Sequence, residues 1–391
     1  MRRARYRWRC HGFGLLVVLT AVTVIGYGVL LALHQPLAQL ELVPHVFHPG
    51  VGESSSTRAR RLPVADIGME PRSFCDGRLV AYGRQFAQLK SVVVDRRYCH
   101  SERLGGEAID TVINQPESVE YYHFDPGCFQ LVCASEPSAT SGKLNYVFAG
   151  SSNHLNDWLG SVQLTKTDST DDHVDHRLPR FTVAITRYEY VNLYHTMTDW
   201  YNAFLLVCFF NETSDSTDIL FIDSHPIGSL DPVWRRLFRR TLRLSDLSSE
   251  RPTLFNQLTW GWLGYNSLMT IYQSSPTPPL IEEFRSFFLS AYGIPAATTL
   301  PGRPDCDGMR LSVTFIWRRD YVAHPRNPVG SVTRKIANEE ELERRVKLQL
   351  PQARVTGVQI DRYTMDEQLR IITDTDILIG ECISNSRCKT C

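Results

Sequence analysis

The sequence predicts an α/β fold: a pair of Rossmann-type domains, each built on a parallel sheet, behind an N-terminal transmembrane helix. First, 391 residues are too many for one ordinary hydrophobic core and fit about two domains. Second, two parts of the chain alternate apolar strands with amphipathic helices, which is the pattern of parallel sheets. Third, an uncharged segment near the N-terminus has the length of a membrane-spanning helix.

The N-terminal region carries the membrane prediction. Residues 1–12 contain five arginines and no acidic residue, and residues 13–33 then run for 21 positions without a charge. At 1.5 Å per residue a helix of that length extends about 31 Å, enough to cross a bilayer core. A cleaved signal peptide is the alternative, but its apolar region normally covers about 7–15 residues, and no small-x-small cleavage site follows here. We therefore predict a cytoplasmic tail at 1–12, an anchor at 13–33 and a luminal body, as in a single-pass type II membrane protein.

The composition of the body agrees with an oxidising compartment. Residues 34–70 contain prolines and serines without periodicity, and we predict a stem there. The chain has ten cysteines, and the candidate disulfide partners, whose pairing the sequence leaves open, are Cys75, Cys99, Cys128 and Cys133. Asn211 begins a glycosylation sequon that is usable only in a luminal chain. The 42 basic and 42 acidic residues balance, which argues against a nucleic-acid partner.

Two series of alternating strands and helices define the predicted domains. The first, in a domain at 71–300, has strands at 181–186 and 218–223, and helices at 191–208 and from Asp231-Pro232 through the following VWRRLFRRTL. The second, in a domain at 301–380, has strands at 311–317, 354–360 and 376–380, and helices from Asn338 to about residue 350 and from Thr364 to about residue 373. Thr364 and Glu367 have the spacing of a capping box.

The stretch 187–204 is rich in rings and has two helical faces. At 100° per residue, one face carries large apolar side chains, which indicate core packing: Leu193, Met197, Trp200, Tyr201 and Phe204. The opposite face carries Asn192, His195, Asp199 and Asn202. His195 and Asp199 are four residues apart and can hydrogen-bond along the helix, and a carboxylate beside an imidazole is a common general-base arrangement. The alternative is a solvated helix face without function.

Three segments of the chain carry a resemblance to a known family. They read TRYEYVNLYHTMTDWYNAF at 186–204, FIDSHPIGSLDPVW at 221–234 and RRDYVAHPRNPVGSVTRKIANEEEL at 318–342. The chain resembles glycosyltransferase family 61, in the form of the plant-type β-1,2-xylosyltransferases of N-glycans. The resemblance implies a Golgi type II membrane protein, and the two strand–helix series predicted above match the GT-B architecture of glycosyltransferases. It also implies transfer of xylose from UDP-xylose to the core β-mannose of N-glycans, with inversion.

The resemblance also implies roles for particular residues. The expected catalytic base is one of Glu189, His195 and Asp199, and the expected substrate contacts are Arg187, Asn192 and Trp200. The expected nucleotide-sugar site comprises Arg318, Arg319, Arg334, Asn338 and Glu339, because guanidinium groups and a helix N-terminus suit phosphate and a carboxylate suits a ribose hydroxyl. The UDP-sugar is a substrate, and we predict no metal and no cofactor. Asp374-Thr375-Asp376 matches a metal-binding D-x-D motif, but it precedes a strand instead of following one, so we interpret it as a helix end.

The chain departs from the family after residue 380. The family continues with a segment like HGAGL, whereas residues 381–391 read ECISNSRCKTC and form an atypical tail. We therefore expect the second domain to be incomplete, which puts the activity of this chain in doubt. Two alternatives stay open: an enzyme of the same family with another donor, such as an O-linked N-acetylglucosaminyltransferase, and a non-catalytic truncated isoform.

Overall fold

The computed structural model describes residues 70–83, 85–133, 158–165, 174, 176–262, 267–271, 278–295, 311–320, 324 and 335–380. The predicted cytoplasmic tail and anchor, the stem up to residue 69, Arg334 and the tail 381–391 lie outside these ranges. Within them, no helix combines the length and the apolar character needed to span a membrane. The chain divides into a larger unit, Ala59–Ala291 with Ala323–Gly330, and a smaller unit, Tyr292–Val322 and Ser331–Cys391 together with Met1–Arg58.

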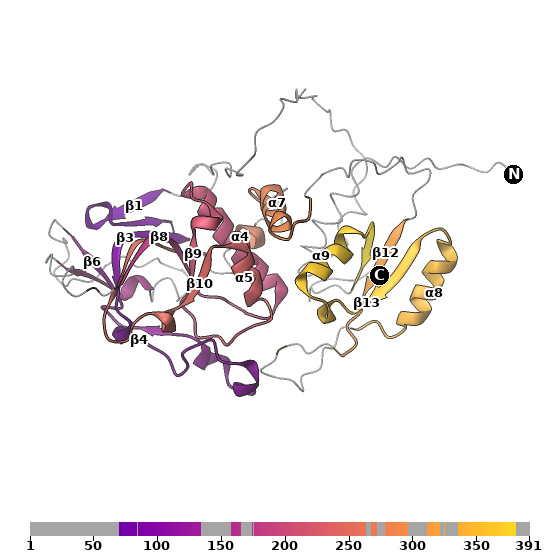
Figure 1. Cartoon of the computed structure of the whole chain (residues 1–391), viewed down its shortest axis with the longest axis horizontal. Coiled ribbons are helices and arrows are strands. Elements are labelled where there is room, and N and C mark those ends of the chain that lie inside the picture. Colours follow the sequence, from indigo (N-terminus) through magenta and orange to yellow (C-terminus); the bar gives the residue numbers. More distant parts are fainter. Residues whose placement is uncertain are drawn as a thin grey trace, which may run out of the picture. The chain divides into compact units, whose positions relative to one another are not determined.

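A mixed sheet forms the centre of the larger unit (Figure 1). Its order among the described strands is β1-β2-β3-β11-β8-β9-β10, with β6 beside β3 and β7 beside β6. The strands are β1 Pro71–Phe74, β2 Leu79–Tyr82, β3 Phe86–Val94, β6 Phe129–Val132, β7 Val162–Thr165, β8 His176–Ile185, β9 Asp218–Phe221, β10 Arg240–Arg243 and β11 Thr253–Trp260. The four neighbours β11, β8, β9 and β10 run parallel, so their carboxyl ends meet at one edge. A separate small sheet pairs β4 Cys99–His100 with β5 His123–Phe124.

The two faces of this sheet bury different side chains. Among the described residues, the α-helices of the larger unit are α4 Leu193–Phe209, α5 Asp231–Leu237, α6 Leu268–Ile271 and α7 Ile281–Ala291. Side chains alternate along a strand, and Phe221 of β9 meets Trp234 of α5 with ring centroids 5.4 Å apart. Its neighbour Leu220 points to the other face and joins a core that contains Trp158 and Trp260. Both faces of the parallel strands are therefore buried, as the apolar strand sequences predict.

The first predicted series is confirmed except at the end of α5. Its strands and the long helix appear as β8, β9 and α4. The predicted helix over VWRRLFRRTL is wrong in its second half, because α5 ends at Leu237 and Arg240–Arg243 forms strand β10 beside β9. Phe238 is extended, and the following arginines 239 and 240 pair with Asp218 at the start of β9. A tertiary contact therefore overrides the local helical preference.

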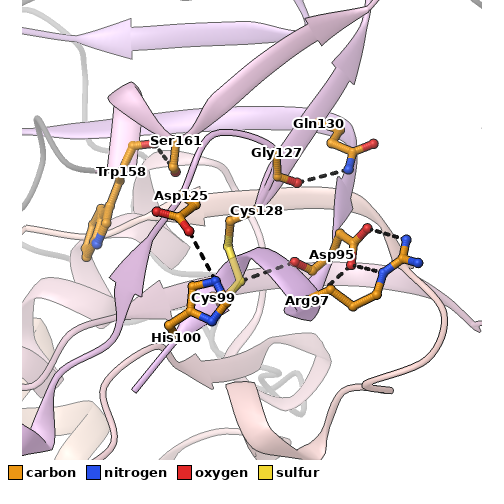
Figure 2. Close-up of a disulfide and its surroundings, with 10 residues drawn as sticks. All are labelled: Asp95, Arg97, Cys99, His100, Asp125, Gly127, Cys128, Gln130, Trp158 and Ser161. Atoms are coloured by element: carbon orange, nitrogen blue, oxygen red, sulfur yellow. Dashed lines mark hydrogen bonds and ion pairs between the residues drawn. A yellow bond between two sulfur atoms is a disulfide. The ribbon is translucent and has the colours of Figure 1, made fainter. Parts of the chain in front are cut away.

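Two disulfides fix the N-terminal part of the larger unit. They join Cys75 to Cys133 and Cys99 to Cys128, which confirms the four predicted partners and supplies the pairing. Figure 2 shows the Cys99–Cys128 bond connecting the start of β4 to the residue before β6. The segment between β4 and β5 is therefore anchored at its base, and that segment reaches the candidate site described below.

The smaller unit contains a three-stranded parallel sheet in the order β13-β12-β14 within the described residues. Its elements are β12 Ser312–Ile316, α8 Glu339–Gln349, β13 Arg354–Val358, α9 Met365–Thr373 and β14 Ile377–Ile379. Figure 1 shows α8 and α9 on opposite sides of the sheet, and alternation along β12 explains this. Phe315 packs in the core that includes residues of α8, whereas Ile316 packs with Ile372 of α9.

The predicted start and end of the second helix in this series are both confirmed. The Thr364 side chain accepts from the Glu367 N–H, and the Glu367 carboxylate accepts from the Thr364 N–H at 2.8 Å, so the capping box is complete. Asp374 is the C-cap residue directly after α9, and Asp376 accepts from the Ser312 N–H at 2.8 Å. The interpretation of the D-x-D stretch as a helix end is therefore confirmed.

Candidate functional site

The carboxyl ends of three neighbouring parallel strands carry charged side chains. Arg187 lies two residues after β8, Asp223 lies two residues after β9, and Arg243 is the last residue of β10. Open α/β sheets place their ligands at this edge, because the loops that leave the strands there can be varied without disturbing the sheet. This edge of the larger unit is therefore the candidate site.

Arg187 is the centre of a buried ion network at this edge. Its guanidinium is 1% exposed and donates to Asp223 from Nε and Nη2, at 3.1 and 2.7 Å, and to Asp231 from Nη1, at 2.9 Å. Arg243 donates to the other oxygen of Asp231 at 2.6 Å. Burial alone would raise the pKa of Asp223, but the attraction of Arg187 outweighs it and lowers that pKa to about 2. Arg187, predicted as a substrate contact, has its guanidinium enclosed by two aspartates in this structure, and its role toward a substrate stays a prediction.

His225 connects this network to the segment between β4 and β5. Its Nδ1 lies 2.7 Å from Glu120 Oε2 and its Nε2 lies 2.9 Å from the Arg187 carbonyl oxygen. A carbonyl can only accept, so Nε2 carries a proton, and the contact between Nδ1 and Glu120 needs a second proton that the pair shares. The His225–Glu120 pair is then neutral as a whole, and the two arginines balance the two aspartates. We call these six residues the buried clamp: Glu120, Arg187, Asp223, His225, Asp231 and Arg243.

Asp199 lies in the second turn of α4 and is buried without a hydrogen-bond donor. Neither carboxylate oxygen makes a hydrogen bond, and the residue is 1% exposed. Burial raises the pKa of Asp199 well above its ordinary value and repulsion from Asp223 adds to this, while Arg187 and the nearby Tyr188 backbone N–H oppose it only in part. Burial therefore favours the protonated form of Asp199 in the folded protein. The expected hydrogen bond from His195 to Asp199 is wrong, because the polar face of α4 turns into the protein at Asp199 instead of out to solvent.

Glu189 lies in the loop before α4 and faces a histidine from far along the chain. Its Oε1 accepts from the Tyr190 N–H at 3.0 Å and lies 2.9 Å from His324 Nε2. The two side chains are 16% and 18% exposed. His195 packs against the Tyr188 and Tyr194 rings, and burial lowers its pKa although Glu189 opposes the shift. We call Glu189, Tyr190, His195 and His324 the Glu189 cluster. Its carboxylate and imidazoles are partly exposed and Tyr190 is buried, whereas the clamp is buried except at Arg243, whose side chain is 13% exposed.

Comparison with curated proteins identifies the relatives of the chain. It is 26% identical over 373 residues to β-1,2-xylosyltransferase RCN11 of Oryza sativa subsp. japonica, which covers 81% of this chain and 68% of that protein. It is 24% identical over 333 residues to a β-1,2-xylosyltransferase of Arabidopsis thaliana, which covers 71% of this chain and 61% of that protein. The chain is xylosyltransferase-like. No protein-family model matches it, and the resemblance predicted from the three sequence segments is confirmed by these relatives.

Two further residues predicted as substrate contacts have structural positions in this xylosyltransferase-like chain. Asn192 is the N-cap of α4, where its Oδ1 accepts from the Tyr194 N–H at 3.0 Å. Trp200 is fully buried and packs against Trp234 and Phe288. The aromatic face of α4 is core, as the helical wheel predicts, and Trp200 is not accessible to a substrate in this conformation.

The predicted nucleotide-sugar residues fall in the smaller unit of the xylosyltransferase-like chain. Arg319 is 57% exposed and its Nε donates to Glu339 at 2.6 Å, so the structure brings these two together at the start of α8. Asn338 precedes α8 but its side chain makes no capping hydrogen bond. Arg318 is half-buried beside Arg319. Their role in binding a nucleotide sugar stays a prediction.

Sequence reasoning missed His324 and the aspartates of the clamp. His324 stands within the quoted segment 318–342, and Asp223 and Asp231 stand within 221–234. A signal was present, since charged residues followed predicted strand ends. The sequence did not show that His324 contacts Glu189, because the two residues are 135 positions apart.

Proposed function

We propose that this chain is an inverting glycosyltransferase that moves xylose from UDP-xylose onto the core β-mannose of N-glycans, in a β-1,2 linkage. The names of its relatives support the sugar and the linkage. The donor nucleotide and the acceptor follow from the family resemblance of the three sequence segments. The observation that carries the proposal is the partly exposed carboxylate–imidazole contact of Glu189 and His324 at the ligand-binding edge of the parallel strands.

Inverting transfer needs few chemical groups. The acceptor hydroxyl must lose its proton as it attacks the sugar, and the departing diphosphate must be stabilised. A base must be reachable by the acceptor, so buried Asp199 is disfavoured among the three candidates. The Glu189 cluster supplies a carboxylate and two imidazoles that solvent reaches in part, and we propose it as the catalytic centre.

We further propose that arginines of the smaller unit, Arg318, Arg319 and Arg334, hold the diphosphate of UDP, with Asn338 and Glu339 at the start of α8 binding the nucleoside. Planar guanidinium groups suit phosphate oxygens because they can donate in a fork. Arg319 would exchange its surface partner Glu339 for phosphate. We propose no metal at the D-x-D stretch, because the Asp376 carboxylate already accepts the Ser312 N–H.

The proposed setting is the Golgi lumen, with the chain held by one N-terminal helix as a type II protein. Asn211 is exposed in the turn after α4, which supports its use as a glycosylation site. We also propose that the two units correspond to the Rossmann-type domains of a GT-B architecture, since each contains parallel strands with helices.

A donor panel tests the function. Membranes containing the full chain are given UDP-xylose, UDP-N-acetylglucosamine or UDP-glucose with an N-glycan whose core β-mannose is intact, and products are separated by mass. The matched control acceptor lacks only the 2-hydroxyl of that mannose. Xylose addition to the intact glycan alone, in a β linkage by NMR, is the expected result. Transfer of another sugar would show a different donor, and no transfer from any donor would contradict the enzymatic proposal.

A further inference from the structure

Carboxylate–imidazole contacts occur at three places in the described part of the larger unit, and their burial differs. Glu120 and His225 are at most 1% exposed, so no substrate reaches them. At the other extreme, Asp125 is 42% exposed between His100 and His123, which are 59% and 78% exposed. Glu189 and His324, at 16% and 18%, lie between these limits. Among these three places, only the Glu189–His324 pair is largely shielded from solvent and still reachable by a substrate.

The contacts of Glu189 determine which nitrogen of His324 carries the proton. Glu189 Oε1 already accepts the Tyr190 N–H, and an ionised carboxylate has acceptor sites only. His324 Nε2, 2.9 Å away, must therefore be the donor. In the neutral imidazole the lone pair then lies on Nδ1. This is the arrangement in which a carboxylate orients a histidine that takes a proton at its other nitrogen.

The buried clamp contacts the Glu189–His324 pair through Tyr190. The Tyr190 ring meets the His324 ring edge-on, with ring centroids 5.4 Å apart, and it also lies against the ring of His225, at 4.8 Å. Gly228 approaches the Tyr190 backbone so closely that a Cβ there would lie 2.5 Å from the Tyr190 carbonyl oxygen. Tyr190, whose N–H binds Glu189, is therefore held on two sides, and so is the carboxylate that orients His324.

We propose that His324 is the general base of the transfer and that Glu189 is its orienting carboxylate. The proposal rests on the proposed function and names the proton acceptor within it. As the acceptor oxygen bonds to C1 of the sugar, the bond from C1 to the phosphate oxygen breaks and UDP leaves with its electron pair. The acceptor O–H bond breaks and its proton passes to His324 Nδ1. The resulting imidazolium is balanced by the Glu189 carboxylate 2.9 Å away.

Kinetics of three variants in the full chain test the assignment. His324→Asn should lower kcat by about 10²–10⁴-fold, with KM for UDP-xylose within about twofold, because ground-state binding of the donor is untouched. Glu189→Gln keeps an acceptor for Nε2–H but loses the charge, so kcat should fall too. His123→Asn removes a histidine from the exposed pair and is the matched control, with kcat expected at the parent value. If Glu189→Gln abolishes transfer while His324→Asn retains the parent kcat, Glu189 itself is the base: the inference fails and the proposed function stands.

A second readout does not need turnover. In the full chain labelled with ¹⁵N-histidine, His324→Asn assigns the ring signals of His324, and their shifts report which nitrogen holds the proton. In the parent we expect the Nε2 signal to be that of a protonated nitrogen hydrogen-bonded to Glu189, and we expect this signal to change in Glu189→Ala. A proton on Nδ1, or signals that Glu189→Ala leaves unchanged, would overturn the inference even if the parent transfers no xylose. Absence of transfer would in that case count separately against the proposed function.

Discussion

Replacing Asp199 by asparagine should change how the stability of the protein depends on pH. In the folded state this carboxyl is buried and its pKa is raised well above 3.8, whereas in the unfolded chain it ionises near that value. Between those two pKa values the folded state binds one proton more than the unfolded state. The parent therefore loses stability as pH rises through this window. The Asp199→Asn variant has no such proton to lose, so its curve should lack this component.

The size of the effect follows from linkage. One pKa unit corresponds to about 1.4 kcal/mol, so the stability of the variant relative to the parent should rise by up to about 1.4 kcal/mol per pH unit above pH 4. The rise ends once the pH passes the folded pKa of Asp199. Any change in shape or packing adds a constant offset but no slope. The pKa of Asp223 is lowered to about 2, so Asp223 titrates below this window. Its stabilising effect is lost as the pH falls from 3.8 through 2. This loss is the same in the parent and in the variant.

Urea unfolding followed by tryptophan fluorescence, at several pH values between about 4 and about 8, measures this difference. Asp215→Asn, at an exposed position, controls for the loss of one surface carboxylate. Parallel stability curves for the parent and Asp199→Asn would refute the reasoning, because they would mean that Asp199 is ionised in the folded protein and finds donors there. A base role for Asp199 would then return to consideration.

Three other substitutions test the fold. Arg187→Met should destabilise the larger unit by about 3–5 kcal/mol, since it leaves two buried aspartates without their shared cation; a loss below about 1 kcal/mol in urea unfolding would contradict the clamp. Removing the Cys75–Cys133 disulfide by a double serine substitution should cost about 4 kcal/mol for a loop of 58 residues, measured as a shift of the urea midpoint. Thr364→Ala should cost about 1 kcal/mol through loss of the capping box, seen as faster amide exchange in α9, and unchanged exchange there would argue against the cap.

The second strand–helix series could be predicted from sequence because its signals are local. The capping box at Thr364 and Glu367 specifies where α9 begins. The alternation of β12 shows in five residues, Ser312–Ile316, with no partner needed to interpret it. The strands before residue 135 could not be ordered, because β3 is paired on one side with β2 and on the other with β11, more than 150 residues later.

The candidate site could be predicted only in part, for a related reason. A helical wheel correctly separates the aromatic from the polar face of α4, but it does not say which face meets the sheet. The wheel places Asp199 on the polar face as a candidate base, with a solvated face as the alternative, whereas in the structure its side chain is buried. Glu189 was found from its segment, whereas its partner His324 depends on a contact between distant segments. Local sequence patterns predict the candidate residues and the bounds of helices and strands. Long-range packing determines which of these residues come into contact.

The buried clamp is better explained by positioning than by stability. Enclosing two arginines and two aspartates costs several kcal/mol per ion in lost hydration, and well-packed apolar side chains of similar volume are often as stable or more so. What apolar side chains cannot do is hold backbone atoms at defined points. The Arg187 N–H donates to Asp223 and the Arg187 carbonyl accepts from His225, so the loop that continues to Glu189 begins at a residue whose backbone is bonded on both sides. An active site works best when its charged groups are already in place before the reaction. A clamp that fixes the start of this loop supplies that condition for the Glu189 cluster, which an apolar replacement of equal stability would not.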